Sequence, residues 1–311
     1  TTPVPASTMA MATATSLTDS ANGFLTAGLK VGDVVRITGF TGAGVTANNA
    51  RNILLTSVAA GTCGVIAVDA TTLIADAAGE SVTITVTGKK CKPPKTGHTN
   101  SYYTFEEYYA DLTKSELFTD CRVATLDFGL PATGNATISA DIVGLGRTLG
   151  AVKAVATHVA ETTTAVMSAI NGYIYVNGTV AGNMTGAAVQ ITDSATQMGA
   201  VIGSNSSPDV SRGRIKVSGS FTGLFDATTY QAFYDAETNI SLILVMTADQ
   251  TATSNVKAIT LGRIKLTGDA PDDGEKGIVR TYPFIAELNS AGGAALAWDE
   301  TLITLQDSSA A

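Results

Sequence analysis

The residues best placed to do chemistry are two adjacent carboxylates inside a cluster of aromatic side chains. The stretch is SYYTFEEYYADL, residues 101–112, which holds five of the 19 aromatic residues of the chain. It could form an acid pair in an aromatic cleft, a stacking platform for a ligand or nucleic acid, or one strand of an ordinary sheet. Neighbouring residues of a strand point to opposite faces, and two catalytic carboxylates must flank one scissile bond. Alternation therefore argues against Glu106 and Glu107 as an acid pair.

As a strand, this segment predicts an aromatic core face. Tyr103, Phe105 and Glu107 would share one side, with Tyr102, Thr104 and Glu106 on the other. We therefore expect Phe105→Asp to abolish soluble folding or assembly, and Glu106→Gln to be nearly neutral for folding. The candidates for structural core or assembly contacts in the whole chain are Tyr103, Phe105, Tyr109, Phe128, Tyr230, Phe233 and Tyr234.

Other motifs give no catalytic, metal or cofactor residue. The sequence GLGRTLG, residues 144–150, has its third glycine one position late for a dinucleotide loop and is interpreted as a flexible loop. The acidic run DAPDDGE, residues 269–275, lacks EF-hand spacing and is interpreted as a solvated turn. The chain has no GxSxG, P-loop or HExxH motif. With two histidines and three widely spaced cysteines, a histidine-rich or CxxC metal site is excluded. The sequence therefore predicts that the protein is not an enzyme and binds no cofactor.

Composition favours strands over long helices. The 311 residues are 45% apolar and only 15% charged, and the abundant threonine and valine fit a pleated surface. The net charge is −8, and residues 96–311 carry the excess acid, which argues against tight binding to DNA phosphates. No stretch reaches the roughly 20 apolar residues of a membrane span, and the first residues lack signal-peptide features. We expect no membrane insertion.

The first 90 residues predict a small β-barrel or sandwich module. Residues 1–22 are interpreted as a weakly specified extended arm. Short strands separated by turns rich in glycine, asparagine and alanine are then expected at 28–40, 52–58, 64–68 and 81–87. The following run KKCKPPKTG combines four lysines with two prolines, which cannot lie in a central strand. It predicts a linker at 91–97.

Residues 98–311 predict a second, larger β domain. Strands at 121–131 and 135–144 flank a turn and should form a hairpin with one buried face. The segment 226–238 places Tyr230, Phe233 and Tyr234 on one helical stripe. It predicts a helix of about three turns, with Asp226 as its N-cap. The fold class is therefore all-β, a two-sheet structure with one flanking α-helix, preceded by the small module.

The order of these segments resembles the tail tube, or major tail, proteins of long, non-contractile-tailed bacteriophages (siphophages). YYTFEEYYADL precedes FTDCRVATLDFGLPATGNATISADIVG, and further segments continue the family's order up to LGRIKLTGDAPDDGEKGIVRTYPFIAEL. The resemblance covers about residues 100–290. The start, with ANGFLTAGLKVGDVVRITGF, is similar to a small β module that some of these proteins carry.

The resemblance implies a structural function. Six copies would form a ring whose inner strands join into one barrel, and rings would stack into a tube around a tape-measure protein. Terminator and tip proteins would complete the tail, with DNA present only in transit through the lumen during genome ejection. It also implies a location in the virion, assembly in the host cytoplasm, and a first module that decorates the outside. The loops at 197–211 and 268–278 are then expected to contact the next ring.

Two other classes of function stay open at this point. The composition, rich in threonine and glycine and divided into two β domains, is also typical of a cell-surface adhesive or carbohydrate-binding β module. An enzyme with an unrecognised site, such as a glycosidase with carboxylates from separate strands, is the remaining alternative.

Overall fold

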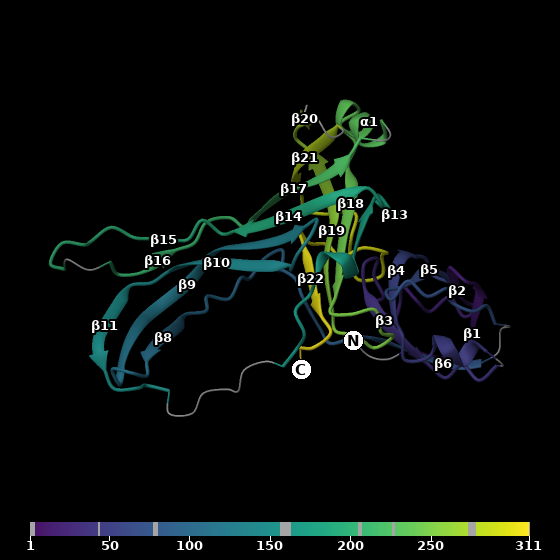
Figure 1. Ribbon diagram of the computed structural model, residues 1–311, viewed down its shortest axis with the longest axis horizontal. Coiled ribbons are helices and arrows are strands. Elements are labelled where there is room, and N and C mark those ends of the chain that lie inside the picture. The colour runs from purple at the N-terminus through teal and green to yellow at the C-terminus, as the bar shows by residue number, and fades with distance from the viewer. Residues whose placement is uncertain are drawn as a thin grey trace.

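The computed structural model describes residues 4–42, 44–76, 80–155, 163–204, 207–225, 228–272 and 278–310. Three parts lie side by side in Figure 1: an arm of strands, a central pair of packed sheet halves, and a small barrel. Apart from two short 3-10 helices, η1 at Val45–Asn48 and η2 at Ala169–Asn171, the described residues contain one helix, α1, at Thr229–Asp235. The prediction of an all-β protein with one helix is confirmed.

The first six strands form a closed barrel in the order β1-β2-β5-β4-β3-β6. Their bounds are β1 Val4–Thr13, β2 Ser16–Asp19, β3 Val34–Thr38, β4 Asn52–Val58, β5 Thr62–Ala67 and β6 Glu80–Val86. The interpretation of residues 1–22 as a loose arm is wrong. Met9, Met11 and Leu17 are fully buried in the barrel core, so these residues form two of its strands.

A single large sheet makes up the centre, in the order β10-β9-β14-β17-β21-β19-β18-β12-β13. Its strands are β9 Lys114–Pro131, β10 Thr137–Val143, β12 Gly172–Val176, β13 Thr179–Val180, β14 Met184–Thr192, β17 Lys216–Leu224, β18 Ile240–Thr247, β19 Val256–Leu266 and β21 Val279–Ala286. Only three residue pairs, from Ile264 to Leu266, join β19 to β21. The two halves bend together there and enclose a core that includes Phe221, Phe284 and Leu242.

Short strands extend this sheet at its edges. β7 (Lys89–Cys91) pairs with β22 (Thr304–Asp307), which pairs with β19, and β20 (Ala270–Asp272) pairs with β21. The arm contains β8 (Tyr103–Tyr109), β11 (Gly146–Ala151), β15 (Thr196–Gln197) and β16 (Val210–Ser211). The expectation of a flexible loop at 144–150 is wrong, because the long β9 offers an edge to which β11 adds.

One face of the central sheet contributes side chains to the hydrophobic core of the barrel. Every residue of β18 is buried, because this strand is covered on both faces. Leu242 and Leu244 point into the space between the sheet halves, whereas Ile243 and Val245 belong to the barrel core. On the neighbouring strand, Tyr175 also joins the barrel core. The barrel therefore packs directly on the sheet.

A buried lysine ties the barrel to the C-terminal segment. Lys30 is 5% exposed, and its Nζ donates hydrogen bonds to the carbonyl oxygens of Gly293, Ala294 and Leu296 at 2.7, 2.7 and 2.6 Å. Gln306 adds a second tie, since its amide nitrogen donates to the carbonyl oxygens of Val34 and Thr87 of the barrel at 2.7 and 2.8 Å. Because lost partners would leave buried carbonyls unsatisfied, these contacts fix the position of the barrel.

The lysine-rich run after the barrel is neutralised by acids. Lys90 forms ion pairs with Asp33 and Asp299, and Lys92 also pairs with Asp299. Burial alone would raise the pKa of Asp299, but the two lysines outweigh it and the pKa lies below its usual value. Asp299 is therefore ionised at neutral pH. The run is a bridge between the barrel and the C-terminal segment, and the division into 1–90, 91–97 and 98–311 stays a prediction.

The helix is shorter than predicted. α1 covers seven residues instead of the segment 226–238. Glu237 adopts a left-handed conformation with φ of 50°, and the amide of Thr238 bonds back to the carbonyl of Phe233, which ends the helix. The proposed N-cap, Asp226, lies outside the described residues; Thr228 occupies the N-cap position without a side-chain capping bond.

Candidate assembly surfaces

The aromatic segment 101–112 contains β8, which lies in a three-stranded sheet that projects from the molecule as the arm (Figure 1). The first half of β9 pairs with β8 and β11, and its second half pairs with β10 and β14. The register of β8 shifts between Tyr103 and Phe105. Beyond this bulge the alternation is regular, so Glu106 and Glu107 lie on opposite faces, as the sequence predicted, and do not form an acid pair.

One face of this arm sheet is covered by the chain that follows β11. The carboxylate of Glu106 accepts hydrogen bonds from the backbone amides of Ala154 and Val155 at 2.7 and 2.9 Å. It also accepts a hydrogen bond from the hydroxyl of Ser115. On the same covering segment, the Lys153 ammonium lies 5.2 Å from the ring centre of Tyr108. Glu106 is thus a structural ligand for a neighbouring backbone segment.

The other face of the arm carries partly exposed aromatic side chains. Phe105 is 37% and Tyr109 38% exposed, and Phe105 lies opposite Phe118 across the β8–β9 pair. Desolvation, and then a hydrogen bond to Glu107, raise the pKa of Tyr109, so this phenol is neutral. We name this surface, which also includes Glu107, the arm face.

Three of the predicted core residues therefore do not lie in a core of the single protomer. Tyr103, at 52% exposure, joins Phe105 and Tyr109 in being solvent-accessible. The physical reason is position: the arm extends beyond the central sheet, so these three side chains have no sheet-on-sheet core to pack into. Of the two roles predicted for these residues, core and assembly, only assembly stays as a proposal.

The predicted core aromatics of the second domain lie nearer to the centre. Phe128, Tyr230 and Phe233 are partly buried against the core between the sheet halves, whereas Tyr234 is 37% exposed. Tyr230 contacts Phe221 edge-on, with ring centres 5.7 Å apart.

The fully buried centre of this aromatic group was missed by sequence reasoning. Phe221 also lies 5.4 Å from Tyr282 and 6.3 Å from Phe284, measured between ring centres. The signal that could have found these rings was alternation, since Tyr282 and Phe284 are two residues apart on one strand.

The arm face gives a testable prediction. Phe105→Asp should leave the protomer folded, because the side chain is already partly in water, but should prevent assembly by placing a charge in an apolar contact. Glu106→Gln, on the covered face, keeps an acceptor for a backbone amide and should assemble normally. Circular dichroism and sedimentation would separate folding from assembly. Loss of soluble protein for Phe105→Asp, or normal assembly, would contradict this role.

The central sheet has a second, contrasting surface. Where β10, β9, β14, β17 and β21 lie side by side, the face turned away from the core has small polar side chains in register across the strands. We name it the polar face; it comprises Thr125, Asp127, Thr137, Ser139, Asp141, Ala188, Gln190, Thr192, Lys216, Ser218, Ser220, Thr222, Thr281, Pro283 and Ile285. Only Asp127, Asp141 and Lys216 among them are charged. The face is therefore rich in hydroxyl-bearing side chains and weakly acidic, with the apolar residues Leu224, Val279, Pro283 and Ile285 on its β17–β21 side.

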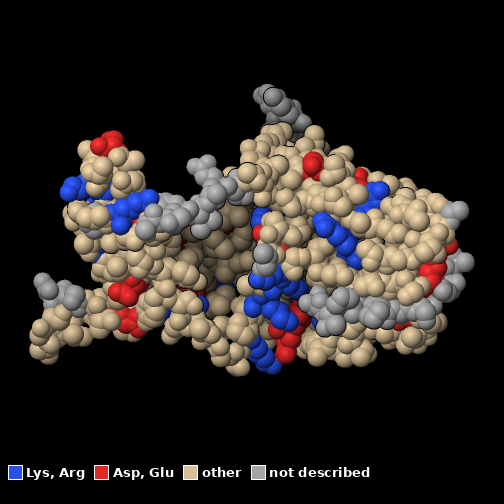
Figure 2. Space-filling model, turned by 90° about the horizontal axis from the view of Figure 1, so that it is seen from below, with Lys and Arg blue, Asp and Glu red and all other residues tan. Residues whose placement is uncertain are grey.

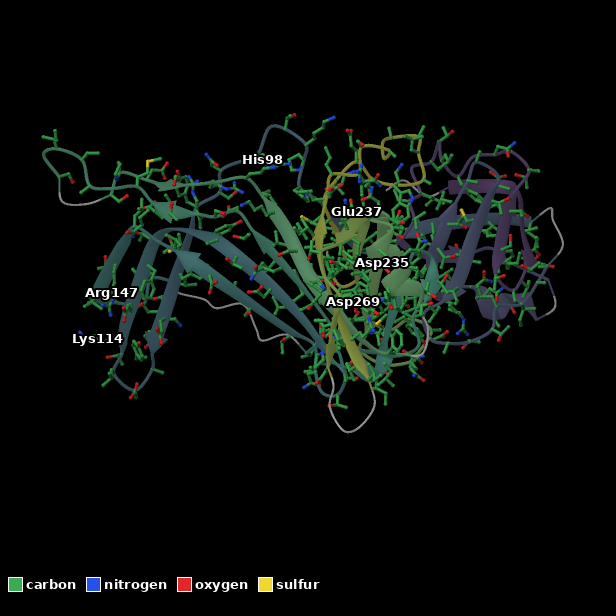
Figure 3. The ribbon with its side chains drawn as sticks, turned by 90° about the horizontal axis from the view of Figure 1, so that it is seen from above. His98, Lys114, Arg147, Asp235, Glu237 and Asp269 are labelled. Atoms are coloured by element: carbon green, nitrogen blue, oxygen red, sulfur yellow. The ribbon has the colours of Figure 1, made fainter. Side chains whose placement is uncertain are left out.

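The described residues do not gather into a metal centre. No three residues of the histidine, cysteine, aspartate and glutamate types come together in a way that could hold a metal ion. In Figure 3, His98 lies apart from Asp235, Glu237 and Asp269, and Lys114 and Arg147 lie at the far end of the arm. Asp269 forms an ion pair with Arg280; part of the acidic run 269–275 falls outside the described residues, as does His158.

Comparison with known proteins identifies the family of this chain. A family model described as "Phage tail tube protein" matches residues 71–286. The chain belongs to the phage tail tube protein family. The match includes β6 of the barrel and continues to the end of β21. The comparison with curated proteins gives no match.

Family membership favours the structural role over the adhesive and enzymatic alternatives considered from the sequence. This tube protein is a structural component of the virion and assembles with itself into a tube. The exposed arm face and polar face are therefore candidate surfaces of that tube, either for contacts between subunits or for its inner wall. Within the described part of the chain, no helix is long and apolar enough to cross a membrane.

Proposed function

We propose that six copies of this tube protein close into a ring, that rings stack into the tail tube, and that the phage genome passes through the bore during ejection. The observation that carries the proposal is the open edge of a sheet with two different faces. In the described structure β10 has a strand neighbour, β9, on one side only. Such an edge presents unpaired backbone groups that pair readily with another chain.

The polar face is the proposed wall of the bore. Joining sheets edge to edge would bring the polar faces of all subunits to one side, with their apolar faces turned into the tube wall. Hydroxyl-bearing side chains and the carboxylates of Asp127 and Asp141 give a hydrated wall that offers few cationic partners for DNA phosphates. This composition supports a conduit through which DNA moves without binding.

The barrel of residues 1–90 is the proposed outer module. It packs against the face of β18 that carries Ile243 and Val245, on the opposite side from the core between the sheet halves. Residues 91–97 connect it to the tube domain of residues 98–311. Resemblance to siphophage tube proteins supports the remaining partners, a tape-measure protein in the lumen and terminator and tip proteins at the ends, and assembly in the host cytoplasm.

Electron microscopy of the purified protein tests the proposal. We expect rings with six-fold symmetry, or long tubes of constant bore, to appear as concentration rises. Class averages of end views would give the symmetry directly. A different symmetry would refute the hexamer, and a monomer that persists at high concentration would refute the ring.

A further inference from the structure

A groove at the root of the arm is lined mainly by apolar side chains. It has a volume of about 510 Å³ and lies between the overhanging strands β9 and β10 and the facing strands β18, β19 and β22. Its apolar lining includes Leu126, Phe128, Ile138, Val166, Met246 and Ile259. Figure 2 shows a hollow where the arm meets the rest of the molecule, beside a group of basic side chains.

Large apolar side chains at the groove are exposed to solvent. Ile138 is 58% and Val166 65% exposed, although both border a hydrophobic surface that continues from the buried core. Exposed apolar surface of this kind marks a contact site in a protein that assembles. Three charged residues line the groove, Lys89, Lys257 and Asp307, of which Lys257 and Asp307 pair with each other. Because most of the remaining lining is apolar, an uncharged apolar occupant suits it.

The same chain carries an uncharged apolar tip elsewhere. Between β15 and β16, Val201 is 50% exposed and the Ile202 side chain is entirely exposed. No charged residue occurs in the sequence from Gln197 to Pro208. This segment could therefore enter an apolar groove without burying a charge.

The other exposed tip of the arm is less suited to the groove. Leu112, at the turn between β8 and β9, is 63% exposed but lies between Asp111 and Lys114. Burying those neighbours would require their desolvation, which opposes the contact. The tip that carries Val201 and Ile202 is the better match.

We propose that the Val201–Ile202 tip of one copy occupies the groove of another copy. The tip belongs to the loop between β15 and β16, which reaches toward the free end of the arm (Figure 1), whereas the groove lies between β9, β10 and the central strands, so a protomer does not fill its own groove. The contact joins two different surfaces, and a contact of that kind propagates from copy to copy. The proposal rests on the proposed stacking of rings and names the contact that joins subunits within it.

Cross-linking can test this contact, because a native thiol already lines the groove. Cys91 is exposed and borders the groove, whereas Cys63 and Cys121 are buried. In assembled Ile202→Cys protein, a short bis-maleimide should join position 202 of one copy to Cys91 of the next. Since each copy carries both thiols, denaturing gels should show a ladder of dimers, trimers and larger products.

Three controls define the outcome. The ladder should vanish in Ile202→Cys with Cys91→Ser, and should not form in wild type or in Leu112→Cys. Ile202→Asp should raise the concentration needed for tube growth by at least about tenfold, whereas Ile202→Val should not. Tubes of Ile202→Cys that give no cross-link, or a ladder that persists without Cys91, would overturn the contact alone. Failure of wild type to form rings or tubes would overturn the proposed function and this contact with it.

Discussion

Deletion of residues 1–86 should cause this tube protein to aggregate. The deletion removes the barrel from the face of β18 and exposes side chains that are at most 3% exposed in the intact protein, among them Tyr175, Ile243 and Val245. Each large apolar side chain loses roughly 1.5–3 kcal/mol of burial. The total is comparable with the entire stability of a typical domain, about 5–15 kcal/mol.

A compensated deletion provides the control for this result. Ile243→Thr and Val245→Thr, introduced into the shortened chain, keep residues that favour strands while making the uncovered face more polar. We expect partial recovery of soluble protein, measured by gel filtration and circular dichroism. If the uncompensated deletion variant were soluble and formed tubes, the barrel would not be needed to cover the apolar face of β18.

A single charge reversal on the polar face should turn a passive conduit into one that holds DNA. Asp127 lies between Ser139 and Gln190 across neighbouring strands, one strand in from the β10 edge of the proposed bore wall. Asp127→Lys replaces one negative charge by one positive charge in every subunit, so a continuous ring of ammonium groups would face the phosphates. Counterion release then favours DNA binding, with a strong dependence on salt concentration.

The measurement is co-sedimentation of linear duplex DNA with tubes assembled in its presence. We expect on the order of tenfold more DNA with Asp127→Lys tubes at low salt, and loss of the difference at high salt. Asp235→Lys is the matched control, because Asp235 is an exposed residue of α1, away from the polar face. Equal retention by both variants would mean that the polar face does not line the bore.

How far the sequence predicts this structure depends on what each pattern encodes. Val82, Ile84 and Val86 alternate with threonine, and that period alone identified β6. In β1, by contrast, Met9 and Met11 alternate with alanine, whose small apolar side chain hides the period, so a barrel strand was interpreted as a loose arm. For α1, the stripe of three aromatics identified the helix, but its end is set by the left-handed backbone of Glu237.

The sequence predicts which residues belong to the assembly surfaces, but not where in the folded protein these residues lie. The aromatics of β8 were found because aromatic clusters are rare in this chain, yet alternation cannot say whether a strand face meets its own core or a second copy. Exposure of Phe105 follows from the projection of the arm, which depends on strand pairings between residues far apart in sequence. The same holds for Lys30, whose three carbonyl partners lie more than 260 positions away.

The length of β9 has a mechanical consequence for a stacked tube. This one strand of 18 residues belongs to the arm sheet at its first half and to the sheet that carries the polar face at its second. If the arm of each subunit holds the next one, a displacement at that contact reaches the bore wall through a covalent backbone stiffened by strands on both sides. A conformational change at one end of the tail would then be transmitted along the tube wall from subunit to subunit.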